Sequence, residues 1–585
     1  MVPKKVQTPS LDYIRHSLAH LLAAAVLKKF PDAKLGVGPT IEDGFYYDFL
    51  LPQSLTADDL KEFESTMRSM IASAAPFKAE KVTPEEARTR FKKQPFKKEL
   101  IKEFAKEGKQ LTIEHTGNFF SDLCRGGHVK NTREIDPQSF ALVKIGGAYW
   151  KSDATKPQLQ RIYGLAFATK KELDEYRTML QEAERRDHKK LGPQLDLFVF
   201  SELVGGGLPL FTPRGTVIRE ELEAFVQSLQ IPMGYERVRI PHITKKELYE
   251  TSGHWQKFKD ELFKITSREG HEFALKPMNC PHHTQIYASR ARSYRELPLR
   301  YSEVTAVYRD EQSGELGGLS RVRMITQDDA HIFCRILHIE EEVMKVWDII
   351  DTFYAVFNMP LTVRFSRHDP AHFEKYLGTP TIWKKAETQL KSAIKKRGVA
   401  YIDGLGEAAM YGPKIDFIAK DSLGRDWQLA TIQLDFNLPE RFALSCVNEK
   451  GKDERIVMVH RAILGSVERF MAVLIEHYAG AFPTWLAPVQ VALLPVGERH
   501  NDYAHTVAHT LKDAGVRVVI EDDNETLGKR IRESEQKKIP YILVLGDKEV
   551  EANTVSVRKH GKGDKGALAL DAFTISLLEE IKNRT

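Results

Sequence analysis

Two widely separated pairs of residues have the spacing and the side-chain types of a metal site or a hydrolytic site. His16 and His20 stand four residues apart in HSLAH, and Cys124 and His128 stand four apart in CRGGH. On a helix, a spacing of four places both imidazoles on one face, where they can share a ligand. Ser17 occupies the position at which the metalloprotease motif H-E-x-x-H needs its glutamate, which excludes that class. Together the pairs predict four zinc-type ligands or a polar hydrolytic cleft, although each pair alone is commonly a coincidence.

A second set of metal-type ligands lies in the middle of the chain. Cys280 stands in KPMNCPHH, His331 in TQDDAHIFC and His460 in VMVHRAILG. One thiolate and two imidazoles would make a three-ligand zinc site whose fourth position stays open for a substrate. Taken singly, each of these residues is more commonly a satisfied buried polar side chain, so the prediction depends on the three segments meeting.

Arginines in the same region have the chemistry for binding phosphate. YRDEQSG carries Arg309 and Glu311 on or just after an expected strand, and HRAILGSVERF carries Arg469 on an expected helix. The guanidinium group offers a rigid fork that suits phosphate and carboxylate, whereas a lone arginine is more often a solvated surface residue. The chain has no G-x-x-x-x-G-K-[ST] run, and no G-x-G-x-x-G follows a strand, so neither a P-loop ATPase nor a dinucleotide-binding protein is supported.

The elements that must position these residues begin with an amino-terminal region of mixed helices and strands, residues 1–168. It opens with an apolar-periodic helix around Ser17–Phe30 and continues through strand and turn patterns. Residues 169–192 are rich in helix formers, with acidic and basic neighbours at helical spacing. They predict a solvated connecting helix, and a helix inside a domain is the alternative.

Two further regions follow the connecting segment. Residues 193–483 form the largest block and mix strands with long helices, and the two prolines of FPTWLAPVQ break its last helix. Residues 487–585 then alternate strand and helix patterns in the order β-α-β-α-β. That order predicts a parallel sheet in a small α/β domain.

Composition excludes several classes of protein. The chain has 585 residues, of which 42% are hydrophobic and 29% charged, values typical of a soluble globular protein with several domains. No stretch approaches the ~18 apolar residues of a membrane span, and the amino terminus lacks a secretory signal, so a cytoplasmic location is expected. A net charge of +5 is compatible with a nucleic-acid partner without requiring one. The four cysteines lie far apart and show no disulfide framework, which favours a reducing compartment.

Several segments resemble the signature motifs of class II aminoacyl-tRNA synthetases, and in particular those of the threonyl-tRNA synthetase family. YERVRIPHI, with Pro241, resembles the first motif, which in this class lies at the dimer interface. LPLRYSEVTAVYRDE followed by SRVRMITQDDAHIF resembles the second motif, and IVMVHRAILGSVERF resembles the third. LKPMNCP and MYGPKIDF are also typical of the family, and the resemblance runs from about His16 to the carboxyl end.

The resemblance implies a multidomain fold and a two-step activity. We expect an α+β editing domain over residues 1–168, a linker helix over 169–192, a class II catalytic domain with an antiparallel sheet over 193–483, and an α/β anticodon-binding domain over 487–585. The enzyme would activate threonine with ATP, transfer it to the 3′ end of tRNA(Thr), and hydrolyse mischarged seryl-tRNA(Thr). It would be a homodimer without membrane contact, and it would use one Zn²⁺ per subunit and Mg²⁺ with ATP.

Carried over position by position, the resemblance also implies the residues of the catalytic domain. The zinc ligands would be Cys280, His331 and His460. The catalytic residues would be Arg309, Lys414 and Arg469. The ATP-binding residues would be Arg309, Glu311, Arg321, Gln428 and Arg469. The threonine-binding residues would be Gln327, Asp329, Tyr411, Gln433 and Ser466.

Two further sites are implied outside that domain. The editing residues would be His16, His20, Lys97, Asp122, Cys124 and His128, with Lys98 as the alternative to Lys97 and Tyr47 in the same family segment. The anticodon-binding residues would be Asn524, Glu549 and Arg558.

This chain departs from the family pattern at three places. The small ubiquitin-like domain that usually precedes the editing domain is expected to be missing. Ile325 stands where the second motif usually has a phenylalanine that stacks on adenine, so we expect weaker ATP binding. Gly127 replaces the proline of the usual C-R-G-P-H, which adds freedom to that loop. His282 replaces the glycine of the usual C-P-G-H, which adds an imidazole beside a zinc ligand.

Chemistry gives a reason for two sites in one enzyme. An apolar pocket separates threonine from the nearly isosteric valine by only ~10²-fold, whereas a zinc that binds the amine and the hydroxyl together rejects valine. Serine keeps that hydroxyl and lacks only a methyl, worth roughly 1–3 kcal/mol, so a hydrolytic site is needed. Two rival functions are an RNA-binding paralogue without catalysis, which the intact Arg309, Glu311 and Arg469 disfavour, and a free-standing zinc hydrolase, which leaves residues 193–585 unexplained.

Overall fold

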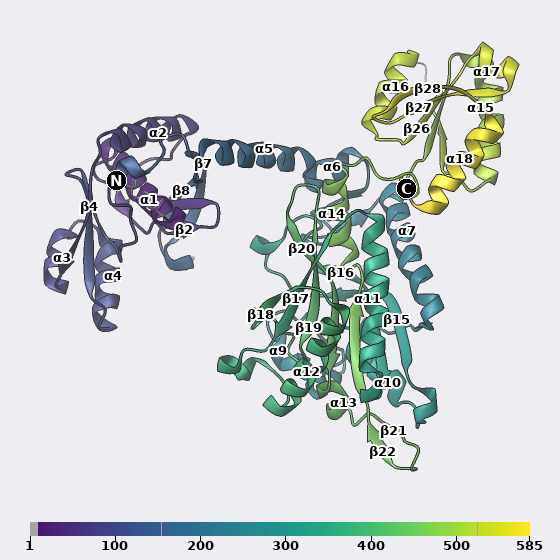
Figure 1. The fold of residues 1–585 in the computed structure, drawn as a ribbon, viewed down its shortest axis with the longest axis horizontal. Coiled ribbons are helices and arrows are strands. Elements are labelled where there is room, and N and C mark those ends of the chain that lie inside the picture. Colours follow the sequence, from purple (N-terminus) through teal and green to yellow (C-terminus); the bar gives the residue numbers. More distant parts are fainter. Residues whose placement is uncertain (1–9, 154, 523–524) are drawn as a thin grey trace, which may run out of the picture. The chain divides into compact units, whose positions relative to one another are not determined.

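The computed structural model describes residues 10–153, 155–522 and 525–585. The chain divides into two compact units, Met1–Gln181 and Glu182–Thr585, each with its own apolar core (Figure 1). None of the described helices combines the length and the apolar character needed to cross a membrane.

The first unit is built around a buried helix, α1 (Leu11–Lys29), which begins six residues before the predicted Ser17. Every residue from Ser17 to Val26 is buried, because α2 and the strands β3 and β6 cover the helix. Thr56 and Thr83 start the next two helices, and each forms a capping box with an acidic residue three positions on. The helices are α2 (Ala57–Ala72), α3 (Pro84–Arg90), α4 (Pro95–Lys106) and the first part of α5 (Lys170–Arg186).

Two sheets complete the first unit. One has five strands in the order β1-β3-β8-β7, with β2 paired to β3, and the other has three strands in the order β4-β5-β6. The sequence analysis did not predict α4, whose first helical residue is Pro95 and which carries the buried Lys97. The strands are β1 (Lys34–Leu35), β2 (Thr40–Ile41), β3 (Gly44–Leu50), β4 (Phe77–Val82), β5 (Leu111–Thr116), β6 (Phe120–Leu123), β7 (Phe140–Tyr149) and β8 (Gln158–Ala166).

The segment that was expected to form one connecting helix forms two helices. Helix α5 ends at Arg186, and α6 (His188–Gln194) begins after Asp187. The break has a local cause, since the Asp187 side chain accepts a hydrogen bond from the Lys189 N–H over 2.9 Å and so caps the second helix.

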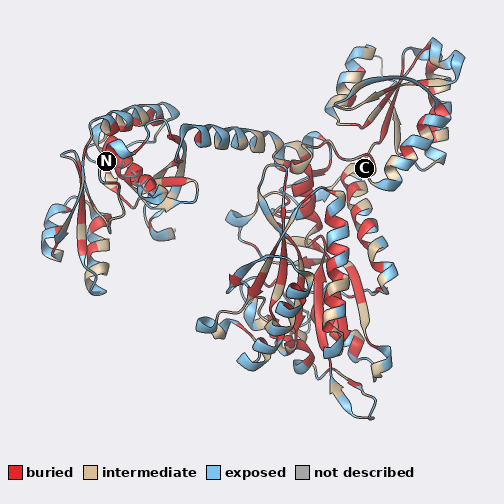
Figure 2. Cartoon of the chain, in the orientation of Figure 1, coloured by how far each residue is buried: buried red, intermediate tan, exposed pale blue. Residues whose placement is uncertain are grey.

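An eight-stranded, mainly antiparallel sheet is the centre of the second unit. Its strand order is β11-β15-β16-β23-β20-β19-β17-β18, and only the two edge pairs are parallel. Helices α7 (Pro213–Gln230), α11 (Ile339–Val356), α12 (Pro380–Arg397) and α14 (Val467–His477) contribute apolar residues to the core that covers one face of this sheet. Figure 2 colours the buried positions red. The strands are β11 (Glu236–Arg237), β15 (Leu299–Tyr308), β16 (Met324–Cys334), β17 (Leu361–Arg367), β18 (Tyr401–Leu405), β19 (Lys414–Lys420), β20 (Asp426–Asp435) and β23 (Val457–Ala462).

Helices and short hairpins surround this sheet. The helices are α7 (Pro213–Gln230), α8 (Lys246–Ser252), α9 (His254–Lys257), α10 (Cys280–Ala288), α11 (Ile339–Val356), α12 (Pro380–Arg397), α13 (Asn437–Arg441) and α14 (Val467–His477). The short strands are β9 (Phe198–Val199), β10 (Leu210–Phe211), β12 (Ile243–Lys245), β13 (Lys264–Thr266), β14 (Glu272–Leu275), β21 (Ser445–Val447) and β22 (Asp453–Arg455).

The carboxyl-terminal part has a mixed sheet, which corrects the predicted all-parallel one. Strands β25, β24 and β26 are parallel, as the β-α-β-α-β pattern required, but β27 and β28 continue the sheet as an antiparallel hairpin. Its elements are β24 (Val491–Pro495), α15 (Asn501–Asp513), β25 (Val518–Ile520), α16 (Leu527–Gln536), β26 (Tyr541–Leu545), α17 (Asp547–Ala552), β27 (Thr554–Lys559), β28 (Gly563–Ala569) and α18 (Leu570–Asn583).

One buried carboxylate fixes the position of α14 relative to the sheet. Asp328 on β16 accepts hydrogen bonds from the backbone N–H groups of Ile463, Leu464 and Gly465 over 2.8, 2.9 and 3.1 Å. Arg461 also donates to it over 3.3 Å, and both side chains are fully buried. The turn from β23 into α14 is therefore tied to the middle of β16.

We expect Asp328→Ala to lower the free energy of unfolding by about 3–5 kcal/mol, because it strands a buried guanidinium and three backbone donors. Chemical denaturation followed by tryptophan fluorescence measures the change. Asp426→Ala, which removes only a surface ion pair with Lys420, is the matched control and should cost about 1 kcal/mol or less. A loss below 1 kcal/mol at position 328 would contradict the role of this carboxylate.

Candidate active sites

One face of the central sheet gathers the polar residues that the sequence analysis singled out. Successive side chains of a strand point to opposite faces, so Gln327, Asp329 and His331 of β16 share one face. The register pairs His331 with His460 of β23, and His460 in turn with Gln433 of β20. Residues far apart in the sequence thus become neighbours because the three strands are adjacent.

The three zinc-type ligands of this region meet. Cys280, the first residue of α10, lies close to this face. Its Sγ and one nitrogen from each of His331 and His460 all lie within 4.8 Å of one another, and all three residues are buried. The imidazole rings of His331 and His460 are 4.7 Å apart, centroid to centroid. The cluster therefore has the donor set of a three-ligand zinc site.

Neighbouring side chains hold the two histidine rings. Asp435 Oδ2 lies 2.9 Å from Nε2 of His460, and Nδ1 of His283 lies 2.8 Å from Nδ1 of His331. Each ring thus uses one nitrogen for orientation and keeps the other for the cluster, as metal-binding histidines commonly do. Burial lowers the pKa of His331 well below its usual value, so its ring is neutral. His283, and not the unusual His282, makes this contact.

The residues predicted to bind threonine surround the cluster, with one exception. Tyr411 donates a hydrogen bond of 2.6 Å to Gln433 Oε1, and its ring stacks on His460 at 4.6 Å. Asp329 Oδ2 accepts a 3.0 Å hydrogen bond from the Asn279 amide, a contact that the sequence analysis missed. Ser466 is different, because it caps α14.

A buried lysine beside this pocket was also missed. Lys276 is fully buried and donates to Thr305 Oγ1 over 2.9 Å. Burial lowers the pKa of Lys276 to about 8, against the opposing effect of the nearby carboxylates Glu303 and Asp329. Lys276 and Asn279 both belong to the segment LKPMNCP, so a closer reading of its polar residues would have found them.

Arginines converge where β15 and β16 separate. Arg309 follows β15 directly, lies over the Phe258 ring at 5.5 Å and leaves its buried Nε without a hydrogen-bond partner among the described residues. Arg321 donates to Glu311 Oε2 over 2.8 Å, and Arg469 donates to the Ser320 carbonyl over 3.0 Å. Burial, and then the charges of Arg309 and Arg321, lower the pKa of Arg469. A concentration of positive charge that lowers a guanidinium pKa suits a polyanionic ligand.

Two predicted residues, Lys414 and Gln428, both contact the carboxylate of Asp416. Lys414 Nζ lies 2.9 Å from Asp416 Oδ2, and the Gln428 amide donates to Asp416 Oδ1 over 2.9 Å. Arg364 contacts both Asp416 and Gln428. Neither Asp416 nor Arg364 was predicted: Asp416 belongs to the family segment MYGPKIDF but was passed over, whereas no motif marks Arg364, which the pairing of β17 with β19 places opposite Asp416.

Ile325 lies on the same face of β16 as Gln327, opposite Val307 of β15, and is partly exposed. Its side chain is therefore available to a ligand held by the arginines, but as an aliphatic surface without a ring.

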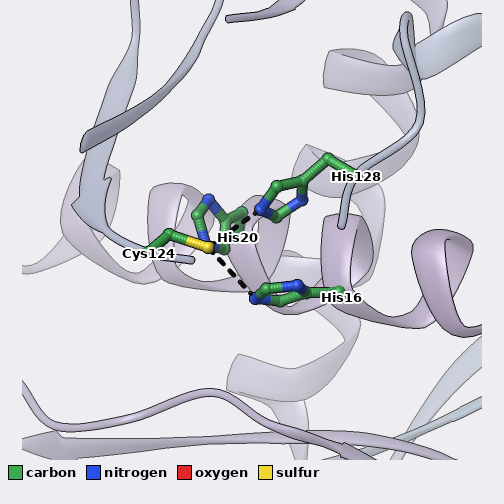
Figure 3. Close-up of side chains that lie close together, drawn as sticks. All are labelled: His16, His20, Cys124 and His128. Atoms are coloured by element: carbon green, nitrogen blue, oxygen red, sulfur yellow. Dashed lines mark hydrogen bonds between the residues drawn. The ribbon is translucent and has the colours of Figure 1, made fainter. Parts of the chain in front are cut away.

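The first unit brings together all four residues of the amino-terminal prediction (Figure 3). Cys124 Sγ lies 3.2 Å from His128 Nε2 and 3.5 Å from His16 Nε2. The rings of His16 and His128 stack at 4.1 Å, and His20 lies 4.3 Å from His128. Helix α1 supplies the histidine pair, and the loop after β6 supplies the other two residues.

A buried polar triad lies beside this cluster. Lys97 Nζ forms a 2.6 Å ion pair with Asp122 and donates to the Tyr47 hydroxyl over 3.1 Å, and Tyr47 also donates to Asp122. All three side chains are buried, whereas Lys98 is exposed. The structure therefore places Lys97 at the site and Lys98 outside it.

His16, His20 and Cys124 of the cluster and all three residues of the triad line one cavity of about 480 Å³ within the first unit. Buried His20, Tyr47, Lys97 and Asp122 form part of its wall, and exposed Arg125 belongs to its rim. The rim also includes Phe104 and Lys109, and none of these three was predicted.

Burial sets the protonation states in this cavity. It lowers the pKa of His128 to about 3, lowers that of His16, and lowers that of His20 well below the ordinary 6.5. It raises the pKa of Cys124 to about 12. At neutral pH the cavity therefore holds neutral imidazoles and a protonated thiol, which disfavours attack by a thiolate.

Two of the three predicted anticodon-binding positions lie in the described part of the chain, at opposite ends of β26. Asn524 lies outside the described residues. Glu549 of α17 accepts a hydrogen bond from the Gly546 N–H over 3.0 Å, after the end of β26. Arg558 of β27 pairs with Ile542, near the start of β26, and lies 3.7 Å from Asp564.

The sheet, its arginines and its metal-type cluster are the features of a class II aminoacyl-tRNA synthetase. Residues 263–478 match the tRNA synthetase class II core domain (G, H, P, S and T), residues 490–580 match an anticodon binding domain, and residues 111–163 match the threonyl and alanyl tRNA synthetase second additional domain.

Relatives identify the family within that class. The chain is 48% identical to a threonine–tRNA ligase of Thermosynechococcus vestitus, over 98% of this chain and 96% of the relative. It is 46% identical to one of Thermotoga maritima, over 98% and 88%. The solved RNA binding domain of threonyl-tRNA synthetase from Cryptosporidium parvum Iowa II has a TM-score of 0.65 and 37% identity, over 67% of this chain and 98% of that one. The chain belongs to the threonine–tRNA ligase family. Its activity is the ligation of threonine to tRNA, and its second additional domain supports editing of mischarged tRNA.

We expect deacylation of mischarged tRNA to stay constant between pH 8 and pH 6. A histidine base works in its neutral form, and a lowered pKa keeps that form down to lower pH, whereas an ordinary imidazole would lose roughly four-fold over this range. Initial rates with seryl-tRNA, corrected for hydrolysis without enzyme, measure the dependence. A several-fold fall with an apparent pKa near 6.5 would contradict the lowered values.

Proposed function

We propose that the face of the central sheet selects threonine through a zinc ion bound by Cys280, His331 and His460. The observation that carries the proposal is the convergence of the three ligand atoms within 4.8 Å. A structural zinc would need a fourth protein ligand, whereas these three ligands leave the remaining coordination positions of the ion open for a substrate. When bound, the ion would accept the amine and hydroxyl of threonine as ligands, which valine cannot match.

The residues around the ion fit such a site on three grounds. The ligand histidines are oriented through their second nitrogens by Asp435 and His283. Burial raises the pKa of Cys280 well above its usual value, so the buried thiolate needs a cation to form. Asp329 would accept the threonine hydroxyl proton, while Tyr411 and Gln433 would close the pocket.

The arginines would position ATP with its Mg²⁺ beside the amino acid. Arg309, with its unpaired Nε, would bind the α-phosphate and the threonine carboxylate, and Arg469 and Arg321 would bind the remaining phosphates. Glu311 would hold Arg321 in place. Lys414 and Gln428, oriented by Asp416, would lie at the other side of the reacting groups. These residues would contribute positioning and charge stabilisation while the threonine carboxylate attacks the α-phosphorus, the bond to the bridging oxygen breaks, and pyrophosphate leaves.

Cys280→Ser should remove the zinc and, with it, threonine-dependent ATP–pyrophosphate exchange. Metal analysis of the purified variant and the exchange assay measure the two losses together. Cys446→Ser, at another buried cysteine, is the matched control and should keep one zinc per chain. Full zinc occupancy in Cys280→Ser would remove this residue from the ligand set.

We propose that the cavity of the first unit hydrolyses seryl-tRNA without a metal ion. The neutral imidazoles of His16, His20 and His128 would take the proton of the attacking water, and Lys97, oriented by Asp122, would donate to the ester carbonyl. The 30° stack of two histidine rings supports a metal-free site, since a tetrahedral ion spreads its ligands. The walls around the triad would exclude the extra methyl of threonine.

The double variant His16→Ala, His20→Ala should deacylate preformed seryl-tRNA more slowly than wild type, by about 10²-fold or more. That is the order of magnitude that the loss of a general base costs. Wild type should be fast on seryl-tRNA and should spare threonyl-tRNA. His115→Ala, at a histidine whose side chain hydrogen-bonds to Glu80 and Ser121 and does not line the cavity, is the control. Equal rates in wild type and double variant would show that these histidines do not edit.

We propose that two copies associate through the surface around Pro241. Support comes from two exposed apolar residues within ten positions of Pro241 in the sequence, Ile231, 67% exposed, and Ile243, 49% exposed. Together with tRNA, ATP and threonine, a second copy would be a partner of this chain in the cytoplasm.

Light scattering of the protein at micromolar concentration should give twice the 66.7 kDa mass of one chain. Ile243→Glu should shift the mass towards one chain, because a buried unpaired carboxylate opposes association. An active wild-type protein that remains a monomer under these conditions would refute the proposal.

A further inference from the structure

The rim of the cavity in the first unit carries a guanidinium group with unused hydrogen-bonding capacity. Arg125 is exposed and follows Cys124 directly in the chain. Within the described part of the chain it forms no hydrogen bond and no ion pair, and its guanidinium lies 4.7 Å from the centre of the Phe104 ring. Glu107, an acid whose pKa the charge of Arg125 helps to lower, is paired with Lys109. Stacking on Phe104 thus holds the guanidinium and its five N–H donors at the mouth of the cavity, where no described residue accepts a hydrogen bond from them.

We propose that Arg125, stacked on Phe104, binds the phosphodiester group on the 5′ side of the terminal nucleotide of a charged tRNA. The inference rests on the proposed editing function and names a subsite for it. An ester at the 2′ or 3′ oxygen must reach the imidazoles beside Cys124, while the 5′ phosphate of the same nucleotide points back towards the rest of the RNA. That phosphate therefore leaves the cavity at its rim, where an arginine fork gives a charge-assisted contact.

Two seryl esters separate this subsite from the hydrolytic residues. One is seryl-adenosine, which has no phosphate, and the other is a seryl-CCA trinucleotide, which has the phosphodiester. Arg125→Gln should lower kcat/KM for the trinucleotide by roughly 10-fold or more and leave seryl-adenosine unchanged. Arg125→Lys should be intermediate, because it keeps the charge without the fork. Lys98→Gln, an exposed cation on the neighbouring helix, should change neither.

Each remaining outcome has a definite meaning. If wild type is active and Arg125→Gln loses equally on both esters, or loses on neither, the phosphate subsite is overturned. The editing proposal would remain intact in that case. A wild type that cleaves neither ester nor seryl-tRNA would remove both.

A second, independent observation concerns the loop that carries Arg321. His188, the first residue of α6, is buried and uses both ring nitrogens: Nδ1 donates to Glu476 over 2.6 Å, and Nε2 accepts the Leu319 N–H over 3.1 Å. This pattern fixes a neutral ring with its proton on Nδ1. It also leaves no nitrogen for a metal, although Asp187, His188 and Glu476 are close enough to suggest one.

We infer that His188 is a positioning residue for ATP, as the second anchor of the loop around Leu319. Arg469 and Glu476 are seven residues apart on α14, about two turns, and so share one face. Arg469 holds the loop directly at the Ser320 carbonyl, and Glu476 holds it through His188 at the neighbouring amide. Gly318 allows the close approach, because a Cβ there would lie 2.4 Å from His188 Nε2.

Two substitutions divide the two hydrogen bonds of this ring. Asparagine can keep the bond to Glu476 but has no acceptor at the Nε2 position, whereas glutamine can place an oxygen there. His188→Asn should therefore raise KM for ATP by roughly 2- to 10-fold, with kcat and KM for threonine little changed, and His188→Gln should recover part of the loss. Gly318→Ala should act like His188→Asn, because it pushes the loop away from the ring. Lys190→Gln, on the same short helix, is the control.

Hydrogen exchange of the peptide spanning residues 316–324 gives a readout that a general loss of stability would not mimic. It should quicken in His188→Asn and Gly318→Ala while peptides from the rest of the sheet stay unchanged. An unchanged KM for ATP with unchanged loop exchange in both variants, or a glutamine variant worse than the asparagine variant, would overturn the role.

Discussion

The pairing of β16 with β15 and β23 is the constraint on which the catalytic face depends. Because side chains alternate along a strand, this one register puts Gln327, Asp329 and His331 on the substrate face and the structural Asp328 on the other. A slip of one residue would exchange the two sets and destroy both the ligand cluster and the anchor of α14. The network of Asp328 with the turn into α14 therefore contributes to function, since that helix carries Arg469 and Glu476.

In the proposed function, the two units divide a discrimination that one pocket cannot achieve. The hydroxyl and amine of threonine can be tested together by a metal, which rejects valine, but serine offers the same two groups. Removing serine needs a second cavity that works on the ester, and the first unit has one with neutral histidines and a buried Lys97–Asp122 pair. Burial has different consequences at the two proposed sites: it lowers the pKa of His128 in one, which keeps the imidazole neutral, and it raises the pKa of Cys280 in the other, so that a thiolate there would need a cation.

Sequence patterns predicted the chemistry better than the connections between residues. Spacing and motifs predicted the two sets of metal-type ligands, the helix that carries His16 and His20, and the antiparallel catalytic sheet. Hydrogen-bond partners such as Asp435, Asp416 and His188 were not predicted from the sequence. Each of these contacts depends either on the pairing of neighbouring strands or on a loop contact across more than a hundred residues. The other two differences have local causes. Asp187 caps a second helix within the segment expected to form a single helix. The hairpin of β27 and β28 adds two antiparallel strands to the parallel strands of the carboxyl-terminal sheet. Gly127 has φ +88°, a conformation closed to the proline usual in the family, so this loop follows a path of its own.

Zinc K-edge X-ray absorption of the purified wild-type protein tests the central claim most directly. The account predicts about one zinc per chain, with a single sulfur at about 2.3 Å, two imidazole nitrogens at about 2.0–2.1 Å, and further nitrogen or oxygen donors when threonine is added. A first shell without sulfur, a shell that threonine leaves unchanged, or two zinc ions per chain with one bound among His16, His20, Cys124 and His128 would contradict it.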